Sequence, residues 1–140
     1  MTPQGVMIFA VFVQVGLSIW AIISLGMTRI AELKKREIAL ADIAVSTDAY
    51  PERIRQYERN VQNQFELPIL FFACVCLAIS LSAANWIMAG FALAFSISRL
   101  IHRHIHVGRN RLQTRFKVYA FGLFCICVMW IGLAYEILLG

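Results

Sequence analysis

The sequence predicts an all-α fold, a transmembrane antiparallel four-helix bundle. Its composition is the first observation in support, because 60% of the 140 residues are hydrophobic and only 15% are charged. A soluble domain of this size would not normally carry so apolar a balance. The second observation is that three stretches contain no Asp, Glu, Lys or Arg: residues 1–28, 67–98 and 118–135. The chain is therefore expected to be an integral, multi-pass membrane protein.

The lengths of these stretches predict the individual helices. About 20 helical residues, at about 1.5 Å of rise each, cross a hydrocarbon core of about 30 Å, so the first and last stretches each fit one span. The middle stretch is too long for a single span even when tilted, and Ser80-Leu81-Ser82-Ala83-Ala84-Asn85 supplies small and polar residues for a turn. We expect a single domain with a cytoplasmic connection over residues 29–58 and helices at 4–28, 59–82, 84–106 and 112–138.

The basic residues predict the topology. All 13 Lys and Arg lie between Arg29 and Lys117, either in the first connection or around the turn between the last two helices. The positive-inside rule then places both connections in the cytoplasm and both termini on the other side. This distribution accounts for the formal net charge of +5, so no nucleic-acid partner is expected. The N-terminal stretch has no basic residue before it and is interpreted as an uncleaved helix, not a signal peptide.

Several polar side chains are expected at membrane depth. Since two helices share the middle stretch, each must include residues from its polar flank, which brings in Asn63 and Glu66 on one helix and Arg99 and His102 on the next. A charge at the bilayer centre costs about 2.5–3.5 kcal/mol. These side chains should therefore face protein or water and not lipid.

The cysteines and histidines do not predict a metal site. The cysteines form two pairs, Cys74 with Cys76 and Cys125 with Cys127. An offset of two residues turns about 200° around a helix, so neither pair converges on one ion. His102 and His106 share a helix face, but the sequence offers no third ligand for them.

Polar residues gather at the cytoplasmic end of every expected helix: Arg29; Arg59, Asn60, Asn63 and Glu66; Arg99, His102, Arg103 and His106; Arg115 and Tyr119. Antiparallel helices bring these groups to one level. Glu66 is the only acidic residue at this depth, and such an excess of guanidinium groups suits an anionic ligand with carboxylates. The alternative is structural, with Asn63, Glu66 and Arg99 bonding one another between helices and the outer arginines extending to headgroups.

Two segments resemble the MAPEG superfamily, the membrane-associated proteins of eicosanoid and glutathione metabolism. They are YERNVQNQFELP at residues 57–68 and SRLIHRHIHVGRNRLQTRFKVY at residues 98–119, and the resemblance extends over essentially the whole chain. It implies a homotrimer with three active sites between neighbouring subunits, each binding glutathione near the cytoplasmic side. The pattern is similar to the bacterial branch, which implies the bacterial inner membrane.

The resemblance also implies roles for single residues. Arg115 matches the arginine that faces the thiol, and is the candidate catalytic residue. The glutathione-binding candidates are Arg29, Arg59, Asn60 and Tyr119, with Asn63, Glu66, Arg99 and His102 as further ligand-side or structural positions. Asn63 stands where the eicosanoid enzymes carry Glu, and Glu66 could supply the carboxylate instead. His106 replaces a tyrosine and Phe116 replaces a serine, which argues against prostaglandin synthesis itself.

Two functions follow as hypotheses. The first is a glutathione-dependent transferase or peroxidase acting on lipophilic electrophiles or lipid hydroperoxides at the membrane. The second is a non-catalytic lipid-binding protein or accessory membrane subunit of the same fold. A transporter or channel is the remaining possibility, and the sequence shows neither a broken helix nor a repeat in its support.

Overall fold

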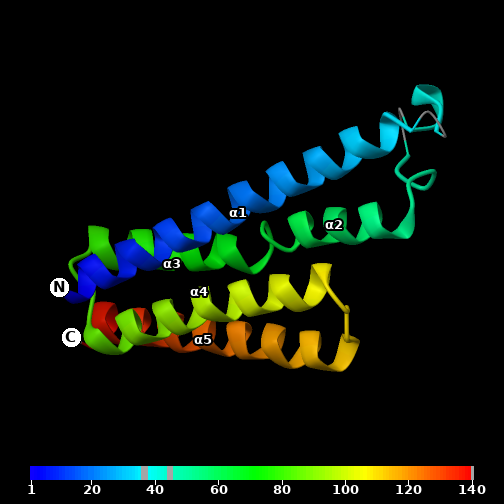
Figure 1. The fold of residues 1–140 in the computed structure, drawn as a ribbon. Helices are drawn as coiled ribbons and strands as arrows, with labels where there is room; N and C mark the ends of the chain where they lie inside the picture. Colours follow the sequence, from blue (N-terminus) through cyan, green and yellow to red (C-terminus); the bar gives the residue numbers. More distant parts are fainter. Residues whose placement is uncertain (36–37, 44–45, 140) are drawn as a thin grey trace.

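In the computed structural model, the described residues (1–35, 38–43 and 46–139) form five α-helices and a short 3₁₀ helix (Figure 1). In chain order these are α1 (Pro3–Leu33), η1 (Leu40–Ile43), α2 (Glu52–Gln62), α3 (Leu67–Ser80), α4 (Trp86–Val107) and α5 (Leu112–Leu138). The all-α prediction is confirmed. The helices lie as four rods, because α2 and α3 follow one another along the same rod (Figure 1).

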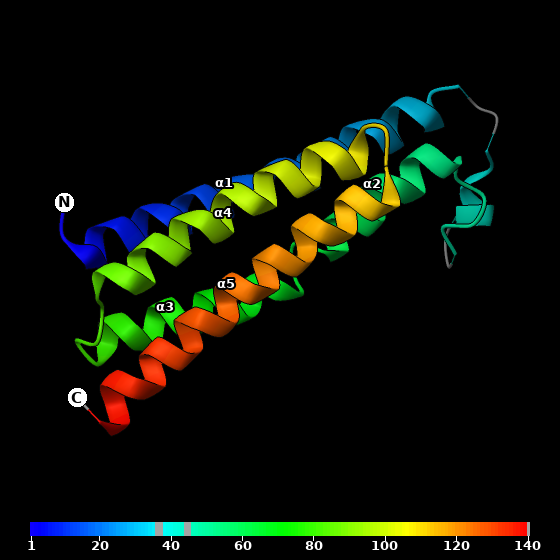
Figure 2. The ribbon, with the colours of Figure 1, turned by 90° about the horizontal axis from the view of Figure 1, so that it is seen from below.

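The rods alternate in direction. Both termini and the turn between α3 and α4 lie at one end of the bundle, whereas η1 and the turn between α4 and α5 lie at the other (Figure 1). Helix α4 packs along α5 and also along α1 (Figure 2). It therefore occupies the middle of the bundle, with a neighbour on either side.

Three helical segments within the described ranges are long and apolar enough to cross a membrane: Pro3–Leu33, Glu52–Ser80 and Leu112–Leu138. Large apolar side chains such as Phe12 and Ile131 are about 70% exposed, as expected of helices that face lipid. The fourth expected span, 84–106, is a helix but falls outside this group, because its second half carries Arg99, Arg103 and two buried histidines.

The expected helix 59–82 is not continuous, and this part of the prediction is wrong. Helix α2 ends at Gln62 and α3 begins at Leu67. Pro68 explains the break, because in a continuous helix its ring would clash with the carbonyl of Gln64 one turn earlier, and its nitrogen carries no hydrogen to donate. A further difference is that α1 extends to Leu33 and α2 begins at Glu52, so both helices reach into the expected connection 29–58.

The core lies where α1, α3, α4 and α5 meet. Phe71 of α3 stacks on Phe95 of α4, with ring centroids 4.7 Å apart. Each cysteine pair places one thiol in the core and the other on the surface: Cys74 and Cys125 are buried, and Cys76 and Cys127 are exposed. The two thiols of a pair therefore point in different directions, as their spacing predicts.

Candidate functional site

A cavity of about 210 Å³ lies beside the α2–α3 break, where α4 and α5 approach it. It is lined by Asn63, Glu66, His102, Leu112, Arg115, Phe116 and Tyr119. Five of these seven residues are among the nine predicted from the sequence, and they come from the break, α4 and α5. The structure thus brings most of the predicted set to one place.

A smaller hollow of about 90 Å³ adjoins this cavity and shares Arg115 with it. Arg59, another predicted residue, lines it together with Arg55, His106, Glu52, Gln56 and Asn110. Three arginines therefore border a small volume, with Glu52 as the only acidic residue among its lining side chains. This composition favours an anionic occupant.

Arg99 lies behind the main cavity and is fully buried. Its Nη2 donates to the backbone carbonyl of Asn63 at 2.8 Å, and its guanidinium carbon is 5.9 Å from the centroid of the Tyr119 ring. The break in the helix explains the first contact, because the last carbonyls of a helix have no partner within it. Over the described part of the chain, the Nε and Nη1 of Arg99 have no hydrogen-bond partner.

An aromatic cluster lies between the two cavities: His102 and Tyr119 line the larger one, and His106 lines the smaller one. The ring of His102 lies 5.5 Å from that of His106 and 6.0 Å from that of Tyr119, measured between centroids. The Nδ1 of His106 is 3.4 Å from the Nδ2 of Asn63, so His106 also contacts the break. His102 Nδ1 and His106 Nε2 are buried without a hydrogen-bond partner among the residues that the structure describes. A bound ligand with polar groups would supply one.

Arg115, the candidate catalytic residue, is half-buried at the start of α5. Its Nη1 donates to the Oδ1 of Asn110 at 2.8 Å. Asn110 has a φ of 48°, a left-handed conformation that asparagine tolerates better than most residues. Asn110 is not among the residues predicted from the sequence, although an asparagine shortly after Gly108 is typical of such a turn.

Two predicted residues lie away from the cavity. Arg29 is on α1, where it pairs with Glu58 at 2.9 Å and lies over the Tyr50 ring. Asn60 is fully buried and accepts a hydrogen bond from Arg103, which is bonded in turn to Ser24 of α1. No residue of α1 lines either of the two adjoining cavities.

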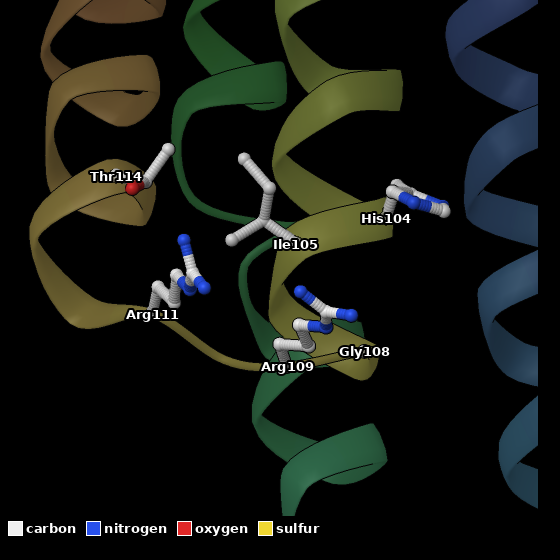
Figure 3. A pocket seen from close by; sticks show the side chains of 6 residues that line it. All are labelled: His104, Ile105, Gly108, Arg109, Arg111 and Thr114. Atoms are coloured by element: carbon white, nitrogen blue, oxygen red, sulfur yellow. The ribbon is translucent and has the colours of Figure 1, made fainter.

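The turn between α4 and α5 forms a separate basic hollow of about 470 Å³. Figure 3 shows Ile105 between His104 and Thr114, with Arg109 and Arg111 on the turn below them. Both arginines are exposed. None of the lining residues belongs to the predicted site, and the exposed charges suit a surface near lipid headgroups.

A further polar contact, which was not predicted from the sequence, crosses the core. Gln14 of α1 is fully buried and donates from Nε2 to the Oε1 of Gln64 at 3.0 Å. An amide in the middle of an apolar stretch is the signal that identifies Gln14, since such a side chain is placed in a bundle interior only with a partner. Gln64 belongs to the break itself and links it to α1.

The fold and the cavities define the class of the molecule as a membrane-associated helical bundle with a cation-rich site near one end. The chain belongs to the MAPEG family, whose model matches residues 7–135. The match covers nearly the whole sequence, so the resemblance found in the two quoted segments is confirmed. A search of curated proteins and a search of solved structures each found no match.

Proposed function

We propose that this protein is a glutathione-dependent transferase or peroxidase that acts on lipophilic electrophiles or lipid hydroperoxides at the membrane. Membership of a family that generally uses glutathione supports the proposal. One observation carries it: Arg115 lines the cavity and the fully buried Arg99 lies against the ring of Tyr119, which also lines it, and within the described residues neither arginine forms an ion pair with a carboxylate. Of the described residues that line this cavity, Glu66 is the only acidic one, and an anionic tripeptide would supply further negative charge.

The chemistry requires that the site favour a thiolate. A thiol with a pKa near 8.5 is only a few per cent ionised at neutral pH, and lowering that pKa by two units takes about 2.7 kcal/mol of preferential interaction with the anion. The Arg115 guanidinium in a partly dry cavity can provide an interaction of this size. With an electrophile, the thiolate sulfur forms the new bond to carbon while a leaving group departs with its bonding electron pair, or while the electron pair of a C=C π bond moves to the neighbouring atom and is then protonated. With a hydroperoxide, two glutathione molecules give a disulfide while the hydroperoxide becomes an alcohol and water.

The cavity supports a site that is completed by a second subunit. At about 210 Å³ it is smaller than the roughly 300–1,000 Å³ of most small-molecule pockets. Arg29 is a predicted glutathione ligand, yet its helix borders neither cavity within one chain. In the homotrimer that we propose, Arg29 reaches the site of a neighbouring subunit.

A second, apolar hollow offers a place for the lipophilic substrate. It measures about 410 Å³ between α4 and α5 and is lined by Ala94, Ile97, Ser98, Ile101, Lys117, Val118 and Phe121. The same hollow supports the second candidate function, a lipid-binding or accessory subunit without catalysis. The broken rod of α2 and α3 removes one argument against a transporter, but the sequence still contains no repeat.

The two functions are separated by titrating the purified protein in detergent with glutathione while the absorbance of the thiolate is recorded. The glutathione enzyme should give a saturable thiolate signal, and Arg115→Ala should abolish it. Arg111→Ala is the matched control, because Arg111 is an exposed arginine on the same turn and its loss should leave the signal unchanged. Absence of binding at millimolar glutathione would favour the non-catalytic candidate.

A further inference from the structure

A second buried arginine on α4, Arg103, contacts α1 and α2 and lines neither cavity of the candidate site. Arg103 is 2% exposed, and its guanidinium carbon lies 4.3 Å from the centroid of the Trp20 ring. It donates from Nη1 to Asn60 Oδ1 and from Nη2 to Ser24 Oγ, the latter at 2.9 Å. Its Nε has no hydrogen-bond partner in the described ranges.

The positive charge of Arg103 is not neutralised by these contacts. All three partners are uncharged, and the two ion pairs seen among the described residues, Arg29 with Glu58 and Lys35 with Glu32, are elsewhere. An unpaired charge in a protein interior carries a desolvation penalty of several kcal/mol. An anion at this position would offset that penalty.

A groove beside Arg103 has room for such an anion. Its volume is about 340 Å³, and it is lined by Trp20, Ser24, Met27, Thr28, Ala31, Tyr57, Arg103 and Val107. It shares no residue with the two cavities of the candidate site. The hydroxyls of Ser24 and Thr28 already donate to backbone carbonyls, so the guanidinium and the Tyr57 phenol are the groups that would bind the anion.

We propose that this groove binds the phosphate headgroup of an anionic phospholipid. Arginine matches phosphate in both charge and geometry. The basic connections place this end of the bundle at the cytoplasmic leaflet, whose anionic lipids attract such sites. The acyl chains would run along the exposed face of α1, where Ile19, Trp20 and Ile23 are each more than half exposed. The site is independent of the proposed glutathione chemistry.

Trp20 reports directly on this lipid. The test uses full-length protein with Trp86→Phe and Trp130→Phe, so that Trp20 is the only tryptophan. The protein is reconstituted without glutathione in phosphatidylcholine vesicles that contain equal fractions of brominated phosphatidylglycerol or brominated phosphatidylcholine. Brominated phosphatidylglycerol should quench Trp20 more strongly, consistent with about fivefold local enrichment by one basic residue.

The variants test whether Arg103 causes the preference. Arg103→Gln should remove it, because Gln keeps a donor for Asn60 and Ser24 but has no charge. Ala31→Glu, which adds an anion at the exposed edge of the groove without changing those bonds, should remove it too and serves if Arg103→Gln does not fold. The double control Arg109→Gln with Arg111→Gln, at the basic turn, should retain the preference.

Several outcomes would overturn the proposal. The first is equal quenching of Trp20 by the two brominated lipids. The second is a preference for phosphatidylglycerol that survives both Arg103→Gln and Ala31→Glu. The third is no quenching by either lipid, which would mean that another subunit covers Trp20. Displacement of the lipid by inorganic phosphate, but not by chloride at the same ionic strength, would also overturn it and identify a soluble anion as the ligand.

Discussion

Replacing Asn60 by Leu should destabilise the folded protein. The effect should not be limited to weaker ligand binding. Asn60 is fully buried, and its Oδ1 accepts a hydrogen bond from the guanidinium of Arg103. A hydrogen bond to a charged group contributes about 1.5–3 kcal/mol. Arg103 would keep only its bond to Ser24. The unfolding constant should therefore rise by about ten- to a hundredfold.

The measurement is thermal unfolding in detergent, followed by tryptophan fluorescence, with glutathione titrations of the same samples. Asn60→Asp is the matched control, because it keeps an acceptor and places a negative charge beside Arg103. This variant should be at least as stable as the unmodified protein. An unchanged unfolding midpoint for Asn60→Leu, together with weaker glutathione binding, would refute the reasoning. It would show that Asn60 acts at the glutathione site, as the family resemblance implies.

Two further substitutions test the packing of the bundle by the same unfolding measurement. Gln14→Leu should lower the free energy of unfolding by about 0.6–1.7 kcal/mol, because it removes the hydrogen bond to Gln64. The double variant Gln14→Leu with Gln64→Leu should lose less than the sum of the two single losses. Strictly additive losses would disprove the coupling. Gly122→Leu should lower the free energy of unfolding by about 1–3 kcal/mol, because a Cβ at this position would lie 3.0 Å from Ser98 Oγ. Gly90→Leu is its control, since a Cβ at Gly90 meets nothing within 4 Å, and equal losses at both glycines would contradict the packing explanation.

The sequence predicted the fold class and the family because both depend on features that recur along the chain. Uncharged stretches of span length indicate membrane helices whatever their packing, and the arrangement of arginines, asparagines and Tyr119 near the helix ends carries the family resemblance. The convergence of Asn63, Glu66, His102, Arg115 and Tyr119 on one cavity followed from the same antiparallel arrangement. These predictions needed no knowledge of which helix faces contact one another.

The break between α2 and α3 was missed because the polar residues before Pro68 follow a helical spacing. Arg59, Asn63 and Glu66 are spaced as on one face of a continuous helix, and only the steric effect of Pro68 on the preceding turn disrupts it. The sequence also did not predict which helices the two arginines of α4 contact. Arg99 and Arg103 differ by only about 40° around a helix, yet one lies toward α5 and the other toward α1.

Helix α4 depends on α2 for its stability, and this dependence connects the two sides of the bundle. The backbone carbonyl of Asn63 accepts a hydrogen bond from Arg99. The Oδ1 of Asn60, three residues earlier on the same rod, accepts a hydrogen bond from Arg103. Without these acceptors, Arg99 would lose its hydrogen bond and Arg103 would keep only the one to Ser24, and charged groups with few partners are costly at membrane depth. A displacement of the last turn of α2 would therefore disturb the hydrogen bonds of Arg99 and Arg103 together.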